Sequence, residues 1–387
     1  METLRVETHI SGNDVHIRSD AFDMHLELNR STPVSPTSVS TSLWLALPIA
    51  MRLGRDLHLC GRIDATALAN AQSLANTWAN WEPGFFHPVH ISADDVSSTP
   101  SRQDRKETLM LYSGGMDSSH ALCREFIAQG RRTDALTIQG MDYKADDDER
   151  FNALLSKTAP LRQEVIDQHF LIRSNVAQQM KRHGIDADIG HGFHLFGCLF
   201  LFEEEYRHGA IAADSPIDQD YVLAPWGTSA HTNNRFCNEQ FSILTLCNDV
   251  DRPAKARLLN DYPNALQSLS FCKHYEVRPD NCGRCSKCIR TKANFELELG
   301  SIPDIFIDPS YSFSDVLALD LTNRENRIPA TNLMMSAYRN GRMNEYRILA
   351  EKIAQHAPHL QPRKESALSR RLRRWKKSIA KRLPGGR

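Results

Sequence analysis

The chain lacks a long hydrophobic run and has no excess of charge of either sign. Its most apolar stretches, residues 43–51 and 193–202, are far shorter than the roughly 20 residues that a membrane-spanning helix needs. The first seven residues, METLRVE, contain no apolar core of the kind that a secretion signal carries. These two absences argue against a membrane or secreted protein and predict a cytoplasmic one.

The zero net charge conceals an uneven distribution along the chain. Residues 363–387 contain eleven Lys or Arg and a single acid, so this tail carries about +10 and the other 362 residues about −10. Residues 367–383 place an apolar stripe at helical spacing on the basic tail. Such a helix is expected to contact either an anionic membrane surface or nucleic acid, and the alternative is a tail that docks on a neighbour.

The first 105 residues have the pattern of a small α+β unit. Strand-like segments 4–10 and 15–28 are separated by the turn Ser-Gly-Asn-Asp at residues 11–14. Helices are expected over residues 43–53, despite Pro48, and 65–81. The sequence further predicts a strand over residues 87–92 and a linker over 97–106.

From residue 107 onward, short apolar runs alternate with longer helical patterns. This alternation predicts an α/β fold, a parallel sheet covered by helices, in which ligands bind beyond the carboxyl ends of the strands. Helical patterns also dominate residues 313–360, most clearly residues 330–356. The expected strands are residues 108–112, 134–139, 168–173, 210–213 and 222–224, and the expected helices are residues 118–129, 146–159 (stopped by Pro160) and 191–206.

A glycine-rich turn joins the first of these strands to its helix. Residues 113–118 read Ser-Gly-Gly-Met-Asp-Ser, and the two glycines let main-chain amides approach an anion at the positive end of a helix. The hydroxyls of Ser113, Ser118 and Ser119 add hydrogen-bond donors. Asp117 is expected either to organise Mg²⁺ and pyrophosphate or to brace the loop.

This turn has neither the Gly-Lys-Ser/Thr ending of a Walker loop nor the G-x-G-x-x-G spacing. It resembles the Ser-Gly-Gly-x-Asp-Ser signature of the PP-loop ATP pyrophosphatases, which have a Rossmann-like, adenine nucleotide alpha hydrolase fold. The resemblance implies ATP binding, Mg²⁺, release of pyrophosphate and an adenylated substrate. It also implies that adenine lies against the end of the second strand. The implied nucleotide contacts are Ser113, Gly114, Gly115, Met116, Asp117, Ser118, Ser119, Ile138, Gln139 and Gly140.

Four of the nine cysteines gather within 17 residues, which in a cytoplasmic protein favours metal binding over disulfides. Cys282, Cys285 and Cys288 follow at x₂ spacing, with Cys272 upstream and Gly283 allowing a tight turn. Four thiolates suit tetrahedral Zn²⁺. An iron–sulfur cluster is the rival, but the bacterial ferredoxin run would need a further Cys where Lys292 stands.

The turn and the cysteines together resemble 7-cyano-7-deazaguanine synthase over residues 107–300, half of the chain. In that group the zinc is structural and lies near the active site. The synthase's Tyr-Gly-Gln-Arg-His-like segment is Gln-Gly-Met-Asp-Tyr-Lys here (residues 139–144), so we expect a different small-molecule substrate. The sequence thus predicts an AMP-forming ligase. The alternatives are a nucleotide-sensing interaction module and a tRNA-modifying adenylating enzyme.

Several further residues are candidates for this site. His191 and His194, one helical turn apart, either contact the triphosphate and transfer protons or simply pack; with Asp117 and Ser118, His191 completes the predicted catalytic set. The donor-rich segments 214–216 and 224–234 are expected to border the substrate. Asp251, Arg252 and Lys255 either add charge to the pocket or are solvated surface, and solvated surface is the preferred interpretation.

These patterns divide the chain into five segments. The N-terminal segment is expected to supply either substrate contacts or the surface of a homodimer. The predicted segments are residues 1–105 (α+β), 106–264 (ATP-binding), 265–300 (zinc-binding), 301–362 (helical) and 363–387 (basic tail).

Overall fold

The computed structural model describes residues 2–34, 36–98, 103–220 and 225–356. The predicted strand 222–224, the central part of the predicted linker and the basic tail therefore lie outside the described residues. Among the helices that are described, none combines the length and the apolar character that crossing a bilayer requires.

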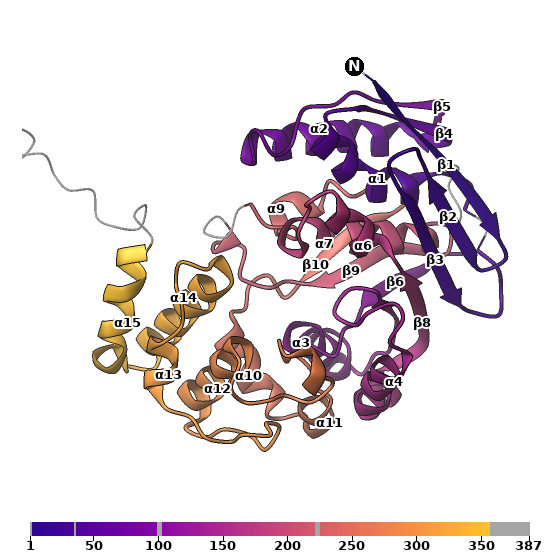
Figure 1. Cartoon of the computed structure of the whole chain (residues 1–387). Coiled ribbons are helices and arrows are strands. Elements are labelled where there is room, and N and C mark those ends of the chain that lie inside the picture. Colours follow the sequence, from indigo (N-terminus) through magenta and orange to yellow (C-terminus); the bar gives the residue numbers. More distant parts are fainter. Residues whose placement is uncertain (1, 35, 99–102, 221–224, 357–387) are drawn as a thin grey trace, which may run out of the picture.

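The described chain is built on one ten-stranded sheet, ordered β10-β9-β6-β7-β8-β3-β2-β1-β4-β5 (Figure 1). The first five strands in this order are mutually parallel. Their apolar runs fit a sheet that is covered on both faces, because such strands bury side chains on both sides. The five strands are β6 (Lys106–Leu111), β7 (Thr133–Gln139), β8 (Ile166–Ser174), β9 (Tyr206–Ala212) and β10 (Ser242–Leu246).

The N-terminal segment continues the same sheet. The predicted hairpin is confirmed, and its turn places Gly12 at φ +63°. The predicted single strand 15–28 is instead two strands, because Ser19 accepts hydrogen bonds from the amides of Ala21 and Phe22 and turns the chain. Strand β3 then pairs antiparallel with β8. The strands are β1 (Thr3–Ser11), β2 (Asp14–Arg18), β3 (Asp23–Asn29), β4 (Asp56–Asp64) and β5 (Ile91–Ser97).

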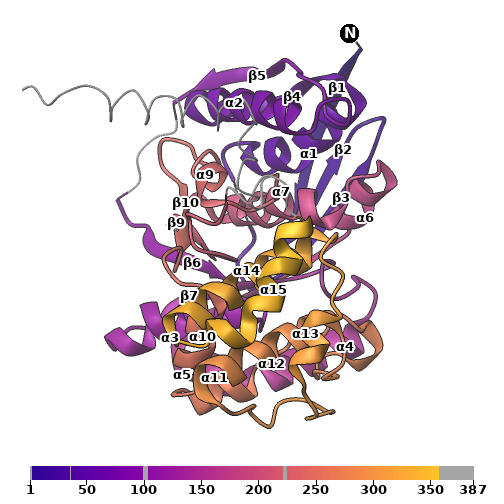
Figure 2. The same cartoon turned by 90° about the vertical axis from the view of Figure 1, so that its left-hand side faces the viewer.

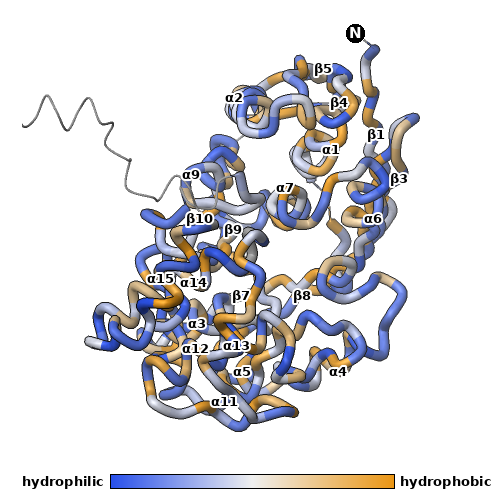
Figure 3. Tube along the Cα trace, turned by 60° about the vertical axis from the view of Figure 1, so that its left-hand side comes forward, coloured by the Kyte–Doolittle hydropathy of each residue, from blue (hydrophilic) through white to orange (hydrophobic). Residues whose placement is uncertain are grey.

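One hydrophobic core lies between the N-terminal helices and the parallel strands. Trp44 of α1 packs against Phe200 and Phe236, with ring centroids 5.6 and 4.8 Å apart. In Figure 3, the hydrophobic residues of α1 and of the nearby strands appear in orange. The helices on this side are α1 (Ser40–Leu53), α2 (Ala65–Trp81), α6 (Val176–Arg182) and α7 (Ala187–Leu199), followed by the short helices η2 (Phe200–Phe202) and α9 (Ala230–Asn233).

A second core covers the other face of the parallel strands, and a third holds the C-terminal helices together. Figure 2 shows these helices grouped at the end of the molecule away from α2 and β5. The helices concerned are α3 (Met116–Glu125), η1 (Ile127–Gln129), α4 (Asp148–Lys157), α5 (Ala159–Val165), α10 (Arg252–Leu259), α11 (Pro263–Gln267), η3 (Tyr275–Val277), α12 (Ser286–Leu299), α13 (Phe313–Leu317), α14 (Arg324–Arg339) and α15 (Met343–His356).

Several predicted boundaries are wrong for local reasons. Pro160 does not stop a helix but lies in the first turn of α5, where its missing N–H costs nothing. The predicted helix 191–206 begins earlier, at Ala187, and its last residue starts β9. The strand expected over 87–92 is displaced to β5, and the helix expected over 330–356 is broken by Gly341 at φ +69°. Strand β10 and helix α6 were not predicted.

The fold is thus α/β with a mostly parallel central sheet, compatible with a Rossmann-like core. The turn at residues 112–115 follows β6, which lies between β9 and β7 in the sheet. The sheet therefore places this turn at the carboxyl edge of neighbouring parallel strands, where α/β proteins bind ligands.

Candidate functional site

The turn after β6 has the geometry of an anion-binding loop. Gly114 adopts φ +75°, and a Cβ there would lie 2.9 Å from Thr158 Cγ2 and 3.2 Å from Leu154 Cδ1. The Ser118 hydroxyl donates to the carbonyl of Gly115 at 3.2 Å. Helix α3 begins at Met116, the residue after Gly115. Among the described residues, none accepts a hydrogen bond from the amides of Met116 and Asp117, as expected for the first turn of a helix.

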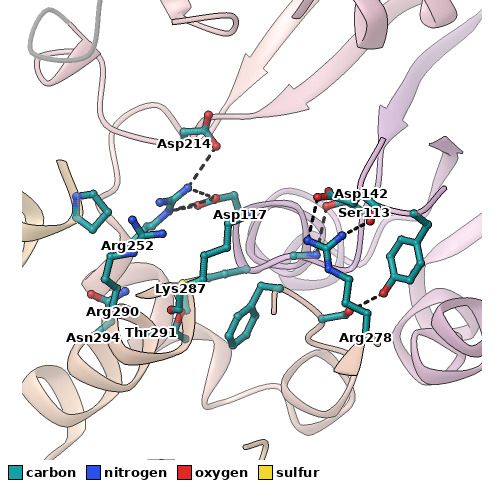
Figure 4. Close-up of a pocket in the computed structure, with 16 residues that line it drawn as sticks. Ser113, Asp117, Asp142, Asp214, Arg252, Arg278, Lys287, Arg290, Thr291 and Asn294 are labelled. Carbon is teal, nitrogen blue, oxygen red and sulfur yellow. Dashed lines mark hydrogen bonds and ion pairs between the residues drawn. The ribbon is translucent and has the colours of Figure 1, made fainter. Parts of the chain in front are cut away.

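The carboxylate of Asp117 is held by two cations of α10. Arg252 Nη2 lies 2.9 Å from Asp117 Oδ2 (Figure 4). Lys255 Nζ lies 2.8 Å from Asp117 Oδ1. Burial by itself would raise the pKa of Asp117, but these cations outweigh it and lower the pKa to about 2. Because both carboxylate oxygens have cationic partners, the observed contacts are those of a residue that braces the loop.

The prediction that Asp251, Arg252 and Lys255 are solvated surface is wrong. Lys255 has no exposed surface, and its ammonium also donates to the carbonyl of Ala213 at 2.5 Å. Asp251 is 5% exposed and caps α10 by accepting from the amide of Ala254. Charged side chains can be buried here because each is paired with a group of opposite charge or a hydrogen-bond partner.

A cavity of about 850 Å³ opens above the loop at the carboxyl ends of β6, β7 and β9. Leu111, Ile138 and Ala212 line it from these strands. Six basic side chains and five acidic ones also line it, with the base-rich side formed by the C-terminal segment. These side chains are Lys181, Arg252, Lys273, Arg278, Lys287 and Arg290, and Asp117, Asp142, Asp186, Asp188 and Asp214.

Four of the basic side chains come from the segment around the cysteines: Lys273, next to Cys272, and three that Figure 4 labels. Figure 4 shows Lys287 and Arg290 on α12, on one side of the loop, and Arg278 on the other, next to Ser113. Arg278 donates to the main-chain carbonyls of Asp142 and Cys272, the latter at 2.6 Å from Nε. Sequence reasoning missed these three residues. The i, i+3 spacing of Lys287 and Arg290 around Cys288 was a usable signal, because it places both on one helix face.

The residues expected near adenine have different surroundings. Ile138 lines the cavity. The Gln139 amide instead donates to the carbonyl of Lys144 and to Asp148 Oδ1, at 3.1 and 3.0 Å. Gly140 adopts φ +114°, and a Cβ there would lie 1.8 Å from the carbonyl oxygen of Ser174. Gln139 and Gly140 therefore shape the turn after β7, while Ile138 faces the space beside it.

The two histidines of α7 also differ. Both line the cavity, but they make different contacts. His191 Nε2 lies 2.9 Å from Thr228 Oγ1. His194 is 1% exposed with Nε2 2.9 Å from Ser174 Oγ, and burial lowers its pKa to about 3. His194 is thus a neutral packed residue.

The segment after β9 lines the cavity as expected through Trp226 and Thr228. Trp226 Nε1 and Thr228 Oγ1 donate to Asp214 Oδ2, at 3.0 and 3.2 Å. Asp214 Oδ1 lies 3.3 Å from Arg252 Nη2. Thr228, which contacts His191, is therefore connected to Asp117 through Asp214 and Arg252.

The four clustered cysteines converge as predicted. Their sulfur atoms all lie within 4.8 Å of one another, which is compatible with a shared metal ion such as zinc. The amides of Arg284 and Cys285 donate to Cys282 Sγ at 3.3 Å, and Cys285 is the N-cap of α12. Gly283, at φ +82°, allows this turn to approach Asp308, whose carbonyl would lie 2.1 Å from a Cβ.

The comparisons with known proteins assign no family. No protein-family model matches the chain, and no curated protein matches it.

Proposed function

We propose that the chain binds ATP on residues 113–118 and transfers its AMP moiety to a small molecule, releasing pyrophosphate. The observation that carries this proposal is the position of the loop. A glycine turn, whose two helix-start amides have no acceptor within the described part of the chain, faces a large cavity at the carboxyl edge of a parallel sheet. Arg278, Lys287 and Arg290 lie around it (Figure 4). The Ser-Gly-Gly-x-Asp-Ser signature of the PP-loop ATP pyrophosphatases supports the same interpretation.

The cavity offers distinct regions to the parts of ATP. The loop amides and the basic side chains of α12 suit the phosphates, because both supply positive potential where charge accumulates. The space beside Ile138 and Leu136 suits the adenine ring, since both side chains line the cavity at β7. Mg²⁺ would be held chiefly by phosphate oxygens and would neutralise their charge. Asp117, paired with Lys255 and Arg252, keeps the loop in place.

The reaction follows from this placement. An oxygen of the substrate attacks the α-phosphorus, the bond between that phosphorus and the oxygen bridging to the β-phosphorus breaks, and pyrophosphate leaves. An amine or ammonia then displaces AMP from the adenylated substrate. The protein's contribution is to position the reactants and to stabilise the charge on the leaving pyrophosphate. His191 stands at the cavity wall as the candidate proton carrier, and the substrate differs from that of 7-cyano-7-deazaguanine synthase. The four cysteines would hold structural Zn²⁺, which fixes α12 and with it Lys287 and Arg290.

ATP binding and product analysis test the proposal. We expect micromolar to millimolar ATP binding by equilibrium dialysis, and AMP and pyrophosphate when Mg²⁺ and fractionated metabolite pools are added. Lys287→Ala should weaken ATP binding about tenfold by removing a charged contact. Arg347→Ala, an 80% exposed side chain of α15, is the matched control and should change nothing.

Three results would contradict the proposal. Failure of the wild-type protein to bind ATP would show that residues 113–118 are not an ATP-binding site. Formation of ADP and phosphate would show that the protein cleaves ATP at the γ-phosphate and does not adenylate its substrate. ATP binding without turnover in any metabolite fraction would favour a nucleotide sensor.

A further inference from the structure

A second group of metal-binding side chains lies on the N-terminal half of the sheet, outside the proposed ATP site. His58 and Cys60 are two residues apart on β4 and therefore share a face, and Asp94 lies on the neighbouring strand β5. Ligand atoms of the three residues all lie within 4.8 Å of one another. Strand pairing thus brings together one nitrogen, one sulfur and one oxygen donor.

The three side chains are on the sheet face that the helices leave uncovered. Leu57 and Leu59, which alternate with them along β4, are fully buried in the core formed with α1 and α2. The side chain of His58 is 19% exposed and that of Asp94 54%. An ion from solution can therefore reach the group without any opening of the fold.

His58 is oriented as a metal-binding histidine usually is. Its Nδ1 lies 3.0 Å from Ser92 Oγ, and its Nε2 lies 3.0 Å from Asp94 Oδ1. A hydrogen bond at one ring nitrogen fixes the ring and directs the other nitrogen towards the ion. Ser92 is the register partner of His58 in the parallel pair, so the sheet itself sets this orientation.

The donor set selects the class of ion. Imidazole and thiolate suit Zn²⁺ and related divalent transition ions, whereas Mg²⁺ and Ca²⁺ require oxygen ligands. Ligands of a tetrahedral zinc ion lie roughly 3–4 Å apart, so only small side-chain rotations are needed. Three protein ligands would leave one position to water, unlike the closed set of four cysteines.

Arg5 on β1 places a positive charge beside this group. Its Nη2 donates to Cys60 Sγ at 3.1 Å, and the side chain is exposed. A bound cation would repel this guanidinium, which must swing into solvent. Glu7, the register partner of Cys60 on β1, adds a negative charge on the same face.

We propose that His58, Cys60 and Asp94 form a second metal site, which binds a divalent transition ion such as Zn²⁺ with an open coordination position. This site is independent of the proposed ATP chemistry, because its residues belong to β4 and β5 and none of them lines the cavity above the loop.

Cobalt uptake by purified protein that carries a single equivalent of zinc, enough for the four cysteines alone, tests the second site. We expect the wild-type chain to take up one Co²⁺ with a thiolate-to-cobalt charge-transfer band in the near ultraviolet. Cys60→Ser should abolish the band and lower Co²⁺ affinity at least tenfold. Cys237→Ser is the matched control, because Cys237 is also a partly buried thiol, and it should behave as wild type. Equal uptake by the wild type and Cys60→Ser, or no uptake by either, would overturn the proposal.

Alkylation of the wild-type protein provides a test that does not depend on the folding of a variant. Added Zn²⁺ should slow the modification of Cys60 by iodoacetamide at least fivefold, while the rate at Cys237 stays unchanged, as followed by peptide mass spectrometry. Identical rates at Cys60 with and without Zn²⁺ would also overturn the proposal.

Discussion

At the scale of single residues, the charge of the loop after β6 depends on Lys255. Its ammonium contacts Asp117 Oδ1 and the carbonyl of Ala213, and none of the residue is exposed. A buried ammonium is stable only with such partners, because desolvation of an unpaired ion costs several kcal/mol. Burial would raise the pKa of Asp117, but Arg252 and then Lys255 lower it to about 2, so the carboxylate is ionised at neutral pH.

Replacement of Lys255 by Met should destabilise the protein by about 3–5 kcal/mol, because it removes the ammonium that the Ala213 carbonyl and Asp117 Oδ1 contact and leaves Asp117 with Arg252 as its cationic partner. Urea unfolding followed by circular dichroism measures the change. Arg347→Met removes a cation whose side chain is 80% exposed, and it should cost less than about 1 kcal/mol. Similar midpoints for the two variants would show that the buried ion pair contributes little.

Gly114 and Gly130 offer a paired test of the loop backbone. Both have positive φ, +75° and +62°, but a Cβ at Gly130 would meet nothing within 4 Å, whereas one at Gly114 would lie 2.9 Å from Thr158 Cγ2. Gly130→Ala should therefore cost only the backbone term of about 1–2 kcal/mol. Gly114→Ala should cost more and also weaken ATP binding. Equal losses of stability with unchanged ATP binding would contradict the close packing of this turn.

At the scale of elements, α12 connects the cysteine cluster to the cavity. Cys288 lies in its first turn between Lys287 and Arg290, and the helix begins immediately after Cys285. Hydrogen bonding with the Cys288 thiol lowers the pKa of Cys285, and the same contact raises the pKa of Cys288. A metal bound by these sulfurs would fix the direction in which α12 presents its basic residues.

Cys288→Ser should therefore remove one equivalent of zinc and loosen α12. We expect inductively coupled plasma mass spectrometry to show the metal loss, and hydrogen exchange to accelerate over residues 281–299. Exchange in β6 and β7 should stay slow, because the four clustered cysteines belong to a different hydrophobic cluster. ATP affinity should fall together with the protection of α12.

The partly buried Cys237 is again the control, since Cys237→Ser removes a thiol outside the cluster. Retention of the full metal content by Cys288→Ser would contradict a four-cysteine site.

At the scale of the whole molecule, Glu203 connects parts of the chain that are distant in sequence. It is 3% exposed, and its carboxylate accepts hydrogen bonds from Ser38 and Asn238. Burial raises the pKa of Glu203 to about 7, and the hydrogen bonds only partly oppose this. Between the unfolded pKa of roughly 4.3 and 7, the folded state holds more protons than the unfolded state, so stability falls as pH rises.

Glu203→Gln should remove this pH dependence. Relative to wild type, the variant should gain roughly 2–3 kcal/mol of stability on going from pH 5 to pH 8, because the wild-type carboxyl must ionise in a buried position. Denaturant unfolding at both pH values measures the difference. If the difference in unfolding free energy between wild type and variant is the same at both pH values, the raised pKa of Glu203 is contradicted.

The sequence by itself determined the features that local chemistry dictates. The alternation of apolar runs and helical patterns predicted an α/β fold with β6, β7, β8 and β9 in place, and the turn at residues 11–14 predicted the first hairpin. The glycines of the loop and the spacing of the cysteines identified the two groups of candidate site residues. Each of these signals lies within a few residues of the sequence. Local backbone preference or ligand chemistry explains each one without reference to residues that are distant in the sequence.

Only the tertiary structure decided which distant residues meet. The pairing of β3 with β8 joins the N-terminal segment to the parallel sheet, and nothing local to either strand specifies its neighbour. Lys255 and Arg252 have an ordinary surface composition, yet packing of α10 against α3 buries them at Asp117. Lys287 and Arg290 likewise reach the cavity only because the fold places α12 beside it. Charge, burial and partner are set together by packing, so the residues that complete this site could not be assigned before the fold was known.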